Sequence, residues 1–227
     1  MGLGWCLKKK SFFVTFEGIE GSGKSYQSKI LYKNLLKNNF SVLLTREPGG
    51  TKGAEKIREL ILKDYFFSDT KEQFDKYTDT LLYLAARNEH VKNKIKPALL
   101  KKKIVICDRF IDSTYAYQVY GKKVKKSLID SVHKYILDNT IPDLTIVLKV
   151  DIAKALHRLN KRKKKNRYDK FNKKFYVNAQ NAFIEIAKKN KKKYFIVDNS
   201  KETKETEKII LSKFLTTINK WIIKTKS

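Results

Sequence analysis

The stretch Gly18-Ile19-Glu20-Gly21-Ser22-Gly23-Lys24-Ser25 decides the fold of this chain. It fits the pattern G-x-x-x-x-G-K-[ST], in which glycines let backbone N–H groups converge on phosphate oxygens at the start of a helix. The pattern predicts that Lys24 reaches the β and γ phosphates of a nucleoside triphosphate and that Ser25 holds Mg²⁺. An apolar stretch of strand character precedes the motif and an amphipathic stretch follows it, which is the context that the motif requires.

Short apolar stretches alternate with longer amphipathic ones along the rest of the chain. Strands are predicted at 12–16, 41–45, 104–107, 144–150 and 194–197, and helices at 24–37, 55–62, 71–101, 124–137, 152–161, 171–189 and 205–225. Strands that are apolar throughout and separated by helices predict an α/β fold with a five-stranded parallel sheet covered by helices on both faces. In such a sheet ligands bind at the carboxyl ends of the strands, so chemistry is expected just after Phe16, Thr45 and Cys107.

An acidic residue ends the third predicted strand, Ile104-Val105-Ile106-Cys107-Asp108. Asp108 is expected to approach Mg²⁺ directly or through water, because this ion keeps octahedral geometry and several of its waters. Cys107 is interpreted as a small buried core side chain.

The charge of the chain points first to a polyanionic partner. The 227 residues include 51 Lys+Arg and 23 Asp+Glu, for a formal net charge of +28. Seven residues are Arg, which leaves 44 Lys, and these lie on almost every predicted helix. Direct nucleic-acid readers concentrate basic residues on one element, so no specific nucleic-acid partner is expected, and the lysine excess is attributed to an AT-rich genome. A nucleic-acid-binding protein with a phosphate-binding loop remains the alternative from another class.

Length and composition predict one domain. Residues 1–10 are interpreted as a flexible leader and 11–227 as the domain. No stretch approaches the roughly 20 apolar residues of a transmembrane helix, so no membrane partner is expected. Cys6 and Cys107 form neither a disulfide framework nor a zinc pattern, which favours a reducing, cytoplasmic setting.

The arginines are informative because lysine is used so freely elsewhere. A guanidinium binds phosphate through two hydrogen bonds, which lysine cannot do. Arg46 and Arg109 directly follow predicted strands, on the expected ligand edge, whereas Arg58 lies mid-helix and is interpreted as a solvated surface charge. A second cluster occupies a lysine-rich connection between two helices and comprises Arg158, Arg162 and Arg167.

Four phrases in this order, the first of which contains the phosphate-binding motif, make residues 11–200 resemble the bacterial-type thymidylate kinase family of P-loop nucleoside monophosphate kinases. They are Phe-Glu-Gly-Ile-Glu-Gly-Ser-Gly-Lys-Ser from Phe16, Thr-Arg-Glu-Pro-Gly-Gly-Thr from Thr45, Leu-Leu-Tyr-Leu-Ala-Ala-Arg from Leu81, and Asp-Arg-Phe-Ile-Asp-Ser-Thr-Tyr-Ala-Tyr-Gln from Asp108. The resemblance implies transfer of the γ-phosphoryl group of ATP to dTMP, giving dTDP and ADP with Mg²⁺, by an enzyme that is usually a homodimer. It also implies that the arginine-bearing segment at about 158–169 is a lid.

The resemblance assigns roles residue by residue. Glu20 contacts the sugar of dTMP, and Arg46 and Arg109 hold its phosphate. Tyr83 stacks on thymine, with Arg87 and Thr114 reading the polar atoms of the base. The remaining residues of the dTMP pocket are Pro48, Ser113, Tyr117 and Gln118, of which Tyr117 crowds the position of a ribose 2′-hydroxyl.

The chain also departs from the family pattern. Phe is more common at position 83, so Tyr83 adds a hydroxyl that needs a polar partner. One branch of the family carries an arginine in the phosphate-binding loop, where this chain has Gly21, so we expect the lid residues Arg162 and Arg167 to supply that charge, and Arg158 less so. The phosphate-binding loop and Asp108-Arg109 do not indicate which base the substrate carries. Another nucleoside monophosphate kinase or a deoxynucleoside kinase therefore remains an alternative. His90, His133 and His157 receive no catalytic or metal role.

Overall fold

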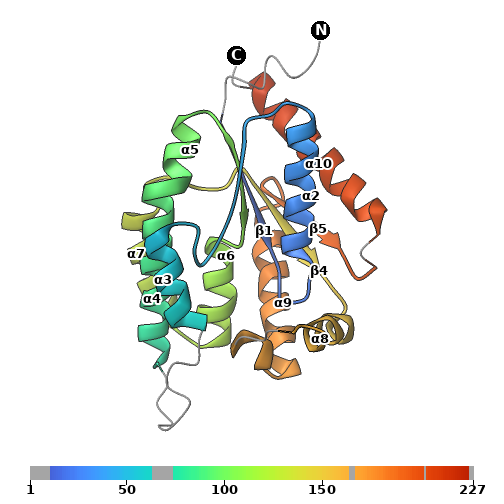
Figure 1. Cartoon of the computed structure of the whole chain (residues 1–227). Helices are drawn as coiled ribbons and strands as arrows, with labels where there is room; N and C mark the ends of the chain where they lie inside the picture. The colour runs from blue at the N-terminus through green and yellow to red at the C-terminus, as the bar shows by residue number, and fades with distance from the viewer. Residues whose placement is uncertain (1–10, 63–73, 164–166, 202, 225–227) are drawn as a thin grey trace.

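The computed structural model describes residues 11–62, 74–163, 167–201 and 203–224, and their centre is one five-stranded parallel sheet (Figure 1). The strands are β1 (Phe12–Glu17), β2 (Val42–Arg46), β3 (Ile104–Asp108), β4 (Leu144–Lys149) and β5 (Tyr194–Asp198), in the order β2-β3-β1-β4-β5. All neighbouring pairs are parallel. The predicted fold class and all five strands are confirmed, with bounds that shift by one residue at most ends. The predicted leader, 1–10, lies outside the described residues.

One face of the sheet packs against α2 (Lys24–Lys37) and α10 (Lys204–Lys224), which lie side by side in Figure 1. Phe12, Val14 and Phe16 of β1 are almost fully buried against this layer, and Phe214 of α10 meets the Phe12 ring edge-on. Because successive strand side chains point to opposite faces, Phe13 joins a separate cluster on the other side. This double burial explains why β1 is apolar without alternation.

The second face is covered by α4 (Lys76–His90), η1 (Val91–Ile95), α5 (Lys96–Leu100) and α9 (Lys173–Lys189). The prediction of a single helix over 71–101 was wrong at its start and in its interior. Asp75 caps α4 by accepting from the N–H groups of Tyr77 and Thr78, so residues 74 and 75 precede the helix. The turn η1 is a π-helix that directly precedes α5, whose second residue is Pro97; the missing N–H of Pro97 cannot continue regular α-helical bonding.

Two elements with no predicted counterpart follow β3 directly: α6 (Ile111–Thr114) and the π-helical η2 (Tyr115–Gly121). They were missed because the segment is short and mixes aromatic with polar residues. Three other helices match their predictions within about three residues: α3 (Lys52–Leu62), α7 (Lys126–Ile136) and α8 (Ile152–Asn160). The 3-10 turn η3 (Arg167–Lys170) was not predicted. Within the described ranges, none of these helices has the length and apolar character needed to cross a membrane.

Candidate active site

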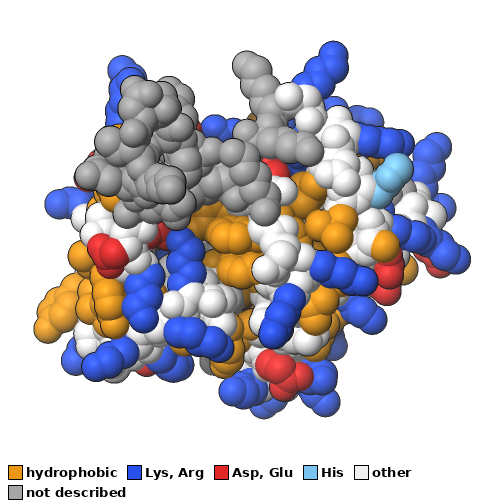
Figure 2. Space-filling view, turned by 90° about the horizontal axis from the view of Figure 1, so that it is seen from below, with side chains coloured by type: hydrophobic (Ala, Val, Ile, Leu, Met, Phe, Trp, Pro, Cys, Tyr) orange, Lys and Arg blue, Asp and Glu red, His pale blue; other side chains and the backbone are white. Residues whose placement is uncertain are grey.

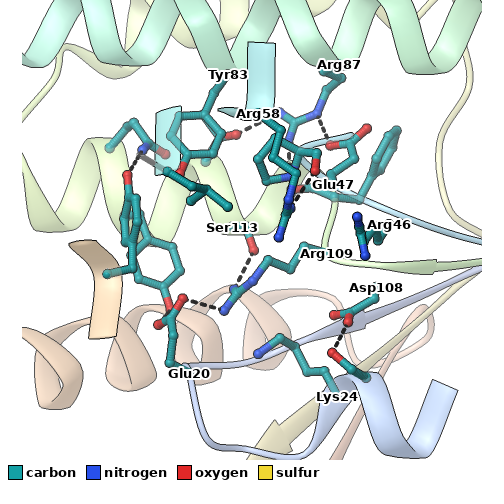
Figure 3. Close-up of a pocket in the computed structure, with 18 of the residues that line it drawn as sticks. Glu20, Lys24, Arg46, Glu47, Arg58, Tyr83, Arg87, Asp108, Arg109 and Ser113 are labelled. Carbon is teal, nitrogen blue, oxygen red and sulfur yellow. Dashed lines mark hydrogen bonds and ion pairs between the residues drawn. The ribbon is translucent and has the colours of Figure 1, made fainter. Parts of the chain in front are cut away.

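A cavity of about 200 Å³ opens at the carboxyl ends of β1, β2 and β3, at the lower end of the sheet in Figure 1. Every residue predicted to hold dTMP lines it (Figure 3): Glu20, Arg46, Pro48, Tyr83, Arg87, Arg109, Ser113, Thr114, Tyr117 and Gln118. Residues of the predicted phosphoryl-transfer and metal sites line the same cavity: Lys24, Ser25, Asp108 and Arg162. The structure thus brings the predicted residues together at this sheet edge, and their roles stay predictions.

The phosphate-binding loop runs from Gly18 to Ser25 and requires glycine at its bends. Gly21 has φ +74°, and a Cβ there would lie 2.6 Å from the carbonyl oxygen of Ala155 in α8. Lys24 turns back onto the loop and donates to the carbonyl oxygen of Ile19 at 2.7 Å. Burial, together with the nearby charge of Arg109, lowers the pKa of Lys24 to about 7. An anion bound at this loop would stabilise the protonated form of Lys24, which burial destabilises.

The side chains of Ser25 and Asp108 meet at the carboxyl end of β3. The Ser25 hydroxyl donates to Asp108 Oδ2, while Asp108 Oδ1 is buried and has no hydrogen-bond partner among the described residues. A hydroxyl beside a carboxylate oxygen with unused acceptor capacity fits a hard cation such as Mg²⁺. In the described part of the chain no group of three His, Cys, Asp or Glu side chains gathers as a metal site.

Arg109 is held in place by its backbone and by its side chain. Its φ is +71°, in the left-handed region that non-glycine residues rarely adopt. Its guanidinium donates to the Gly18 carbonyl and the Ser113 hydroxyl, each at 3.0 Å, and to Glu20 Oε1 at 2.7 Å. Burial alone would lower the pKa of Arg109, but Glu20 and other anions raise it above its usual value, so the group stays charged.

Arg58 corrects an expectation. It was interpreted as a solvated surface charge, but it is partly buried, lines the cavity and donates to the carbonyl oxygen of Pro48 at 2.6 Å. Burial and the neighbouring Arg46 lower the pKa of Arg58. The peptide bond between Glu47 and Pro48 is cis. Figure 3 shows Arg46, Arg58 and Arg109 around the space above Lys24, with the Arg109 guanidinium turned toward Glu20 and Ser113.

The predicted base and sugar pocket is lined by aromatic and hydroxyl groups. The Tyr117 hydroxyl donates to Glu20 Oε2 at 2.6 Å, which joins the two residues that were assigned to the sugar. The Tyr83 ring meets the Tyr168 ring edge-on at 6.1 Å, and its hydroxyl finds its polar partner in Tyr168. Burial and this contact raise the pKa of Tyr83, so it remains a neutral phenol.

Arg87 is 2% exposed and sits in a buried polar network. Its Nε donates to Glu47 Oε2 at 2.8 Å, one Nη donates to Thr114 at 2.7 Å, and the other donates to the Phe110 carbonyl at 2.8 Å. The sequence alone assigned no role to Glu47, which lies in the phrase that begins at Thr45. Burial would raise the pKa of Glu47, but Arg87 and His90 lower it, so the carboxylate is ionised.

Three further buried residues had no assigned role. Glu17 is 0% exposed and accepts from the N–H groups of Phe110 and Ser113 and from the Ser113 hydroxyl, which fixes the start of α6. His90 lies between Thr45 and Glu47, at 2.7 and 3.0 Å. His133 approaches Arg87 from α7. Glu17 could have been found as an acid at a strand end, but nothing in the sequence pairs either histidine with its partner.

The three arginines of the lysine-rich connection separate in the structure. Arg158 donates to the carbonyl oxygens of Gly21, Asn199 and Ser200, which ties α8 to the phosphate-binding loop. Arg162 lines the cavity and pairs with Asp169 at 2.8 Å. The side chain of Arg167 and residues 164–166 lie outside the described residues.

The surface at this end of the molecule is cationic without one dominant patch. Seen from below, Lys and Arg side chains are spread around the visible face (Figure 2). The dispersal matches the spread of lysines in the sequence, and the arginines that converge do so inside the cavity.

Comparisons with known proteins agree with this geometry. A family model described as thymidylate kinase matches residues 16–210. The chain is 41% identical over 199 residues to the thymidylate kinase of Ehrlichia chaffeensis, covering 87% of this chain and 93% of that protein. It is 39% identical over 207 residues to the thymidylate kinase of Mycoplasma capricolum subsp. capricolum, covering 88% and 95%. The crystal structure of the Ehrlichia chaffeensis thymidylate kinase matches with a TM-score of 0.72 and 36% identity, covering 90% of this chain and 99% of that one.

Proposed function

This chain belongs to the thymidylate kinase family and phosphorylates dTMP, and we propose that it transfers the γ-phosphoryl group of ATP in line to the dTMP phosphate within the cavity of Figure 3. The observation that carries this proposal is the convergence of Arg46, Arg58 and Arg109 on one space beside Lys24. Three guanidinium groups around one space suit a phosphate dianion, which each can bind through two hydrogen bonds.

The two substrates enter from different sides of this space. ATP lies on the phosphate-binding loop, where the backbone N–H groups of 18–25 and Lys24 hold its phosphates. The acceptor dTMP lies across Glu20, with its phosphate toward the three arginines and its base between Tyr83 and Arg87. Tyr117, bonded to Glu20, occupies the side of the sugar where a ribose 2′-hydroxyl would need room.

The reaction asks for positioning and charge rather than for covalent catalysis. The acceptor oxygen is already anionic, so no strong general base is needed. Lys24 and Arg109 supply fixed positive charge where negative charge spreads in the transition state. Ser25 and Asp108 would hold Mg²⁺, which when bound neutralises phosphate oxygens.

A lid completes the site in this proposal. Gly21 has no side chain, so the positive charge that stabilises the transferring phosphoryl group comes from Arg162 and Arg167. Arg162 supports the idea because it already lines the cavity while paired with Asp169. Arg158 does not take part, since its guanidinium is bound to three carbonyl oxygens.

Single-turnover kinetics with saturating ATP and dTMP test this assignment. Arg162→Ala and Arg167→Ala are compared with wild type and with Lys163→Ala as the matched neighbour. At least one arginine variant is expected to slow transfer by about 10³-fold, the lower range for arginines of this kind. Wild-type rates in both would show that the lid assignment is wrong.

We also propose a homodimer that works in the cytoplasm. The homodimer follows from the family resemblance and the cytoplasmic setting from the cysteine pattern, because the free, buried thiol of Cys107 suits a reducing compartment. Sedimentation velocity of the purified chain would separate a dimer from a monomer of 26.6 kDa.

A further inference from the structure

A buried histidine stands directly behind the arginine that we assign to the thymine base. His133 lies on α7, is 5% exposed and does not line the cavity. Its Nε2 lies 2.8 Å from an Nη atom of Arg87. The Tyr115 ring meets the imidazole edge-on at 5.8 Å and helps to fix its plane.

The direction of this hydrogen bond follows from the chemistry of the two groups. A guanidinium can only donate, so His133 Nε2 must accept and the ring must be neutral with its proton on Nδ1. Burial and the positive charge of Arg87 lower the pKa of His133 to about 3, which keeps the ring neutral at physiological pH. His133 Nδ1 is buried with no hydrogen-bond partner among the described residues, so the ring sits here at a cost.

Counting donors shows what this acceptor does for Arg87. A guanidinium has five N–H groups. Nε donates to Glu47, one Nη donates to both Thr114 and His133, and the second Nη donates to the Phe110 carbonyl. Four donors are therefore occupied by protein acceptors, and one N–H of the second Nη remains for a ligand in the cavity that Arg87 lines.

We propose that His133 is a positioning residue for base selection: it fixes the rotation of the Arg87 guanidinium so that its one remaining N–H meets a carbonyl oxygen on the pyrimidine ring. This inference rests on the proposed function, in which Arg87 contacts the base. Thymine presents a carbonyl oxygen at ring position 4, where cytosine presents an amino group that cannot accept. A guanidinium held by four acceptors cannot turn away to accommodate the amino group, so the rigidity of the network contributes to the selection.

The test measures KM and kcat for dTMP and dCMP in His133 variants. His133→Phe keeps an aromatic ring at this position but removes the acceptor nitrogen. His133→Leu is a second acceptor-free variant in case the first does not fold. His133→Gln keeps an acceptor oxygen. Tyr135→Ala, at an exposed position on the same helix, is the control. Removing the acceptor is expected to raise KM for dTMP by about tenfold, to leave kcat within about twofold and to narrow the preference for dTMP over dCMP.

The variants distinguish positioning from mere packing. Near-normal KM and selectivity in His133→Gln, with the change confined to the acceptor-free variants, would support the proposal. Unchanged KM in the acceptor-free variants, or equal effects in Gln and Phe, would overturn it. Arg87→Lys separates the role of Arg87 from the role of His133. If this variant leaves KM for dTMP unchanged, the assignment of Arg87 to the base fails. A large effect of Arg87→Lys without an effect of His133→Phe rejects only the role of His133.

Discussion

Burial disfavours the charged form of Lys24, although the site is expected to use this residue as a cation. The residue is 6% exposed, and the groups that receive its hydrogen bonds are neutral oxygens of its own loop. A pKa of about 7 means that the side chain is largely neutral above that pH while the site holds no anion. Phosphate bound beside it would raise the pKa again, because an opposite charge favours the ammonium form.

ATP binding is therefore expected to take up a proton above about pH 7, approaching one proton per site near pH 8. At pH 6 the uptake should vanish because Lys24 is already protonated. Calorimetry in two buffers of different ionisation enthalpy measures this uptake, with Lys24→Met as the control that removes the titrating group. Equal proton uptake by wild type and Lys24→Met at pH 8 would contradict the prediction.

Arg58 gives a second prediction at this scale. Arg58→Gln retains a donor for the Pro48 carbonyl but removes the charge, so KM for dTMP should rise by about tenfold or more, as expected for a lost charged hydrogen bond to phosphate. Lys56→Ala on the same helix, whose side chain is 82% exposed, should leave KM unchanged. Steady-state kinetics with dTMP varied at saturating ATP make the comparison, and an unaffected KM in Arg58→Gln would remove Arg58 from the phosphate site.

The residues that sequence analysis brought together share a simple property. Arg46 and Asp108 end strands and Arg109 directly follows one, and parallel strands end at one edge, so local position determined their neighbourhood. Arg58 was misjudged because its neighbours come from the loop before its helix. The partners of Glu47 and His133 could not be predicted, because such hydrogen bonds depend on side-chain directions set by tertiary packing. The functional roles of all these residues stay predictions.

At the scale of elements, α8 packs closely against the phosphate-binding loop. Arg158 of α8 donates to the Gly21 carbonyl, and Ala155 leaves no room for a side chain at Gly21. The loop is thus held from outside by a helix that also leads into the proposed lid. Movement of the lid would pull on the loop through α8.

Gly21→Ala is expected to disturb this contact. The added methyl would lie 2.6 Å from a backbone oxygen at φ +74°, so the variant should lose several degrees in Tm and raise KM for ATP. Gly53→Ala is the matched control, because the nearest group there is the flexible carboxylate of Glu89 at 3.1 Å. Thermal unfolding and ATP kinetics of both variants check the prediction, which fails if the two behave alike.

Element boundaries were predictable where one local signal dominates. The start of α2 follows from the phosphate-binding motif and was predicted at Lys24. The segment 111–121 was not, because α6 and η2 form on contacts that the local sequence does not contain: Glu17 binds the start of α6, and η2 packs against α9. The π-helical turn η1 likewise reflects the demands of Pro97 within a packed layer.

For the whole molecule, the charge of +28 has two parts. Most of it is lysine spread over the surface, which contributes solubility and long-range attraction for anions, screened beyond about 10 Å at 0.1 M salt. A small part is arginine, and five arginines line one cavity: Arg46, Arg58, Arg87, Arg109 and Arg162. The anion that this arrangement suits is a nucleotide rather than a polymer.

The most direct test of this account is ADP release with ATP and Mg²⁺ against dTMP, dUMP, UMP, CMP and AMP in turn. The account predicts the highest kcat/KM for dTMP, with UMP reduced by the crowding of Tyr117 near the sugar and CMP reduced because the free N–H of Arg87 requires a carbonyl acceptor. A clear preference for CMP or AMP would contradict it.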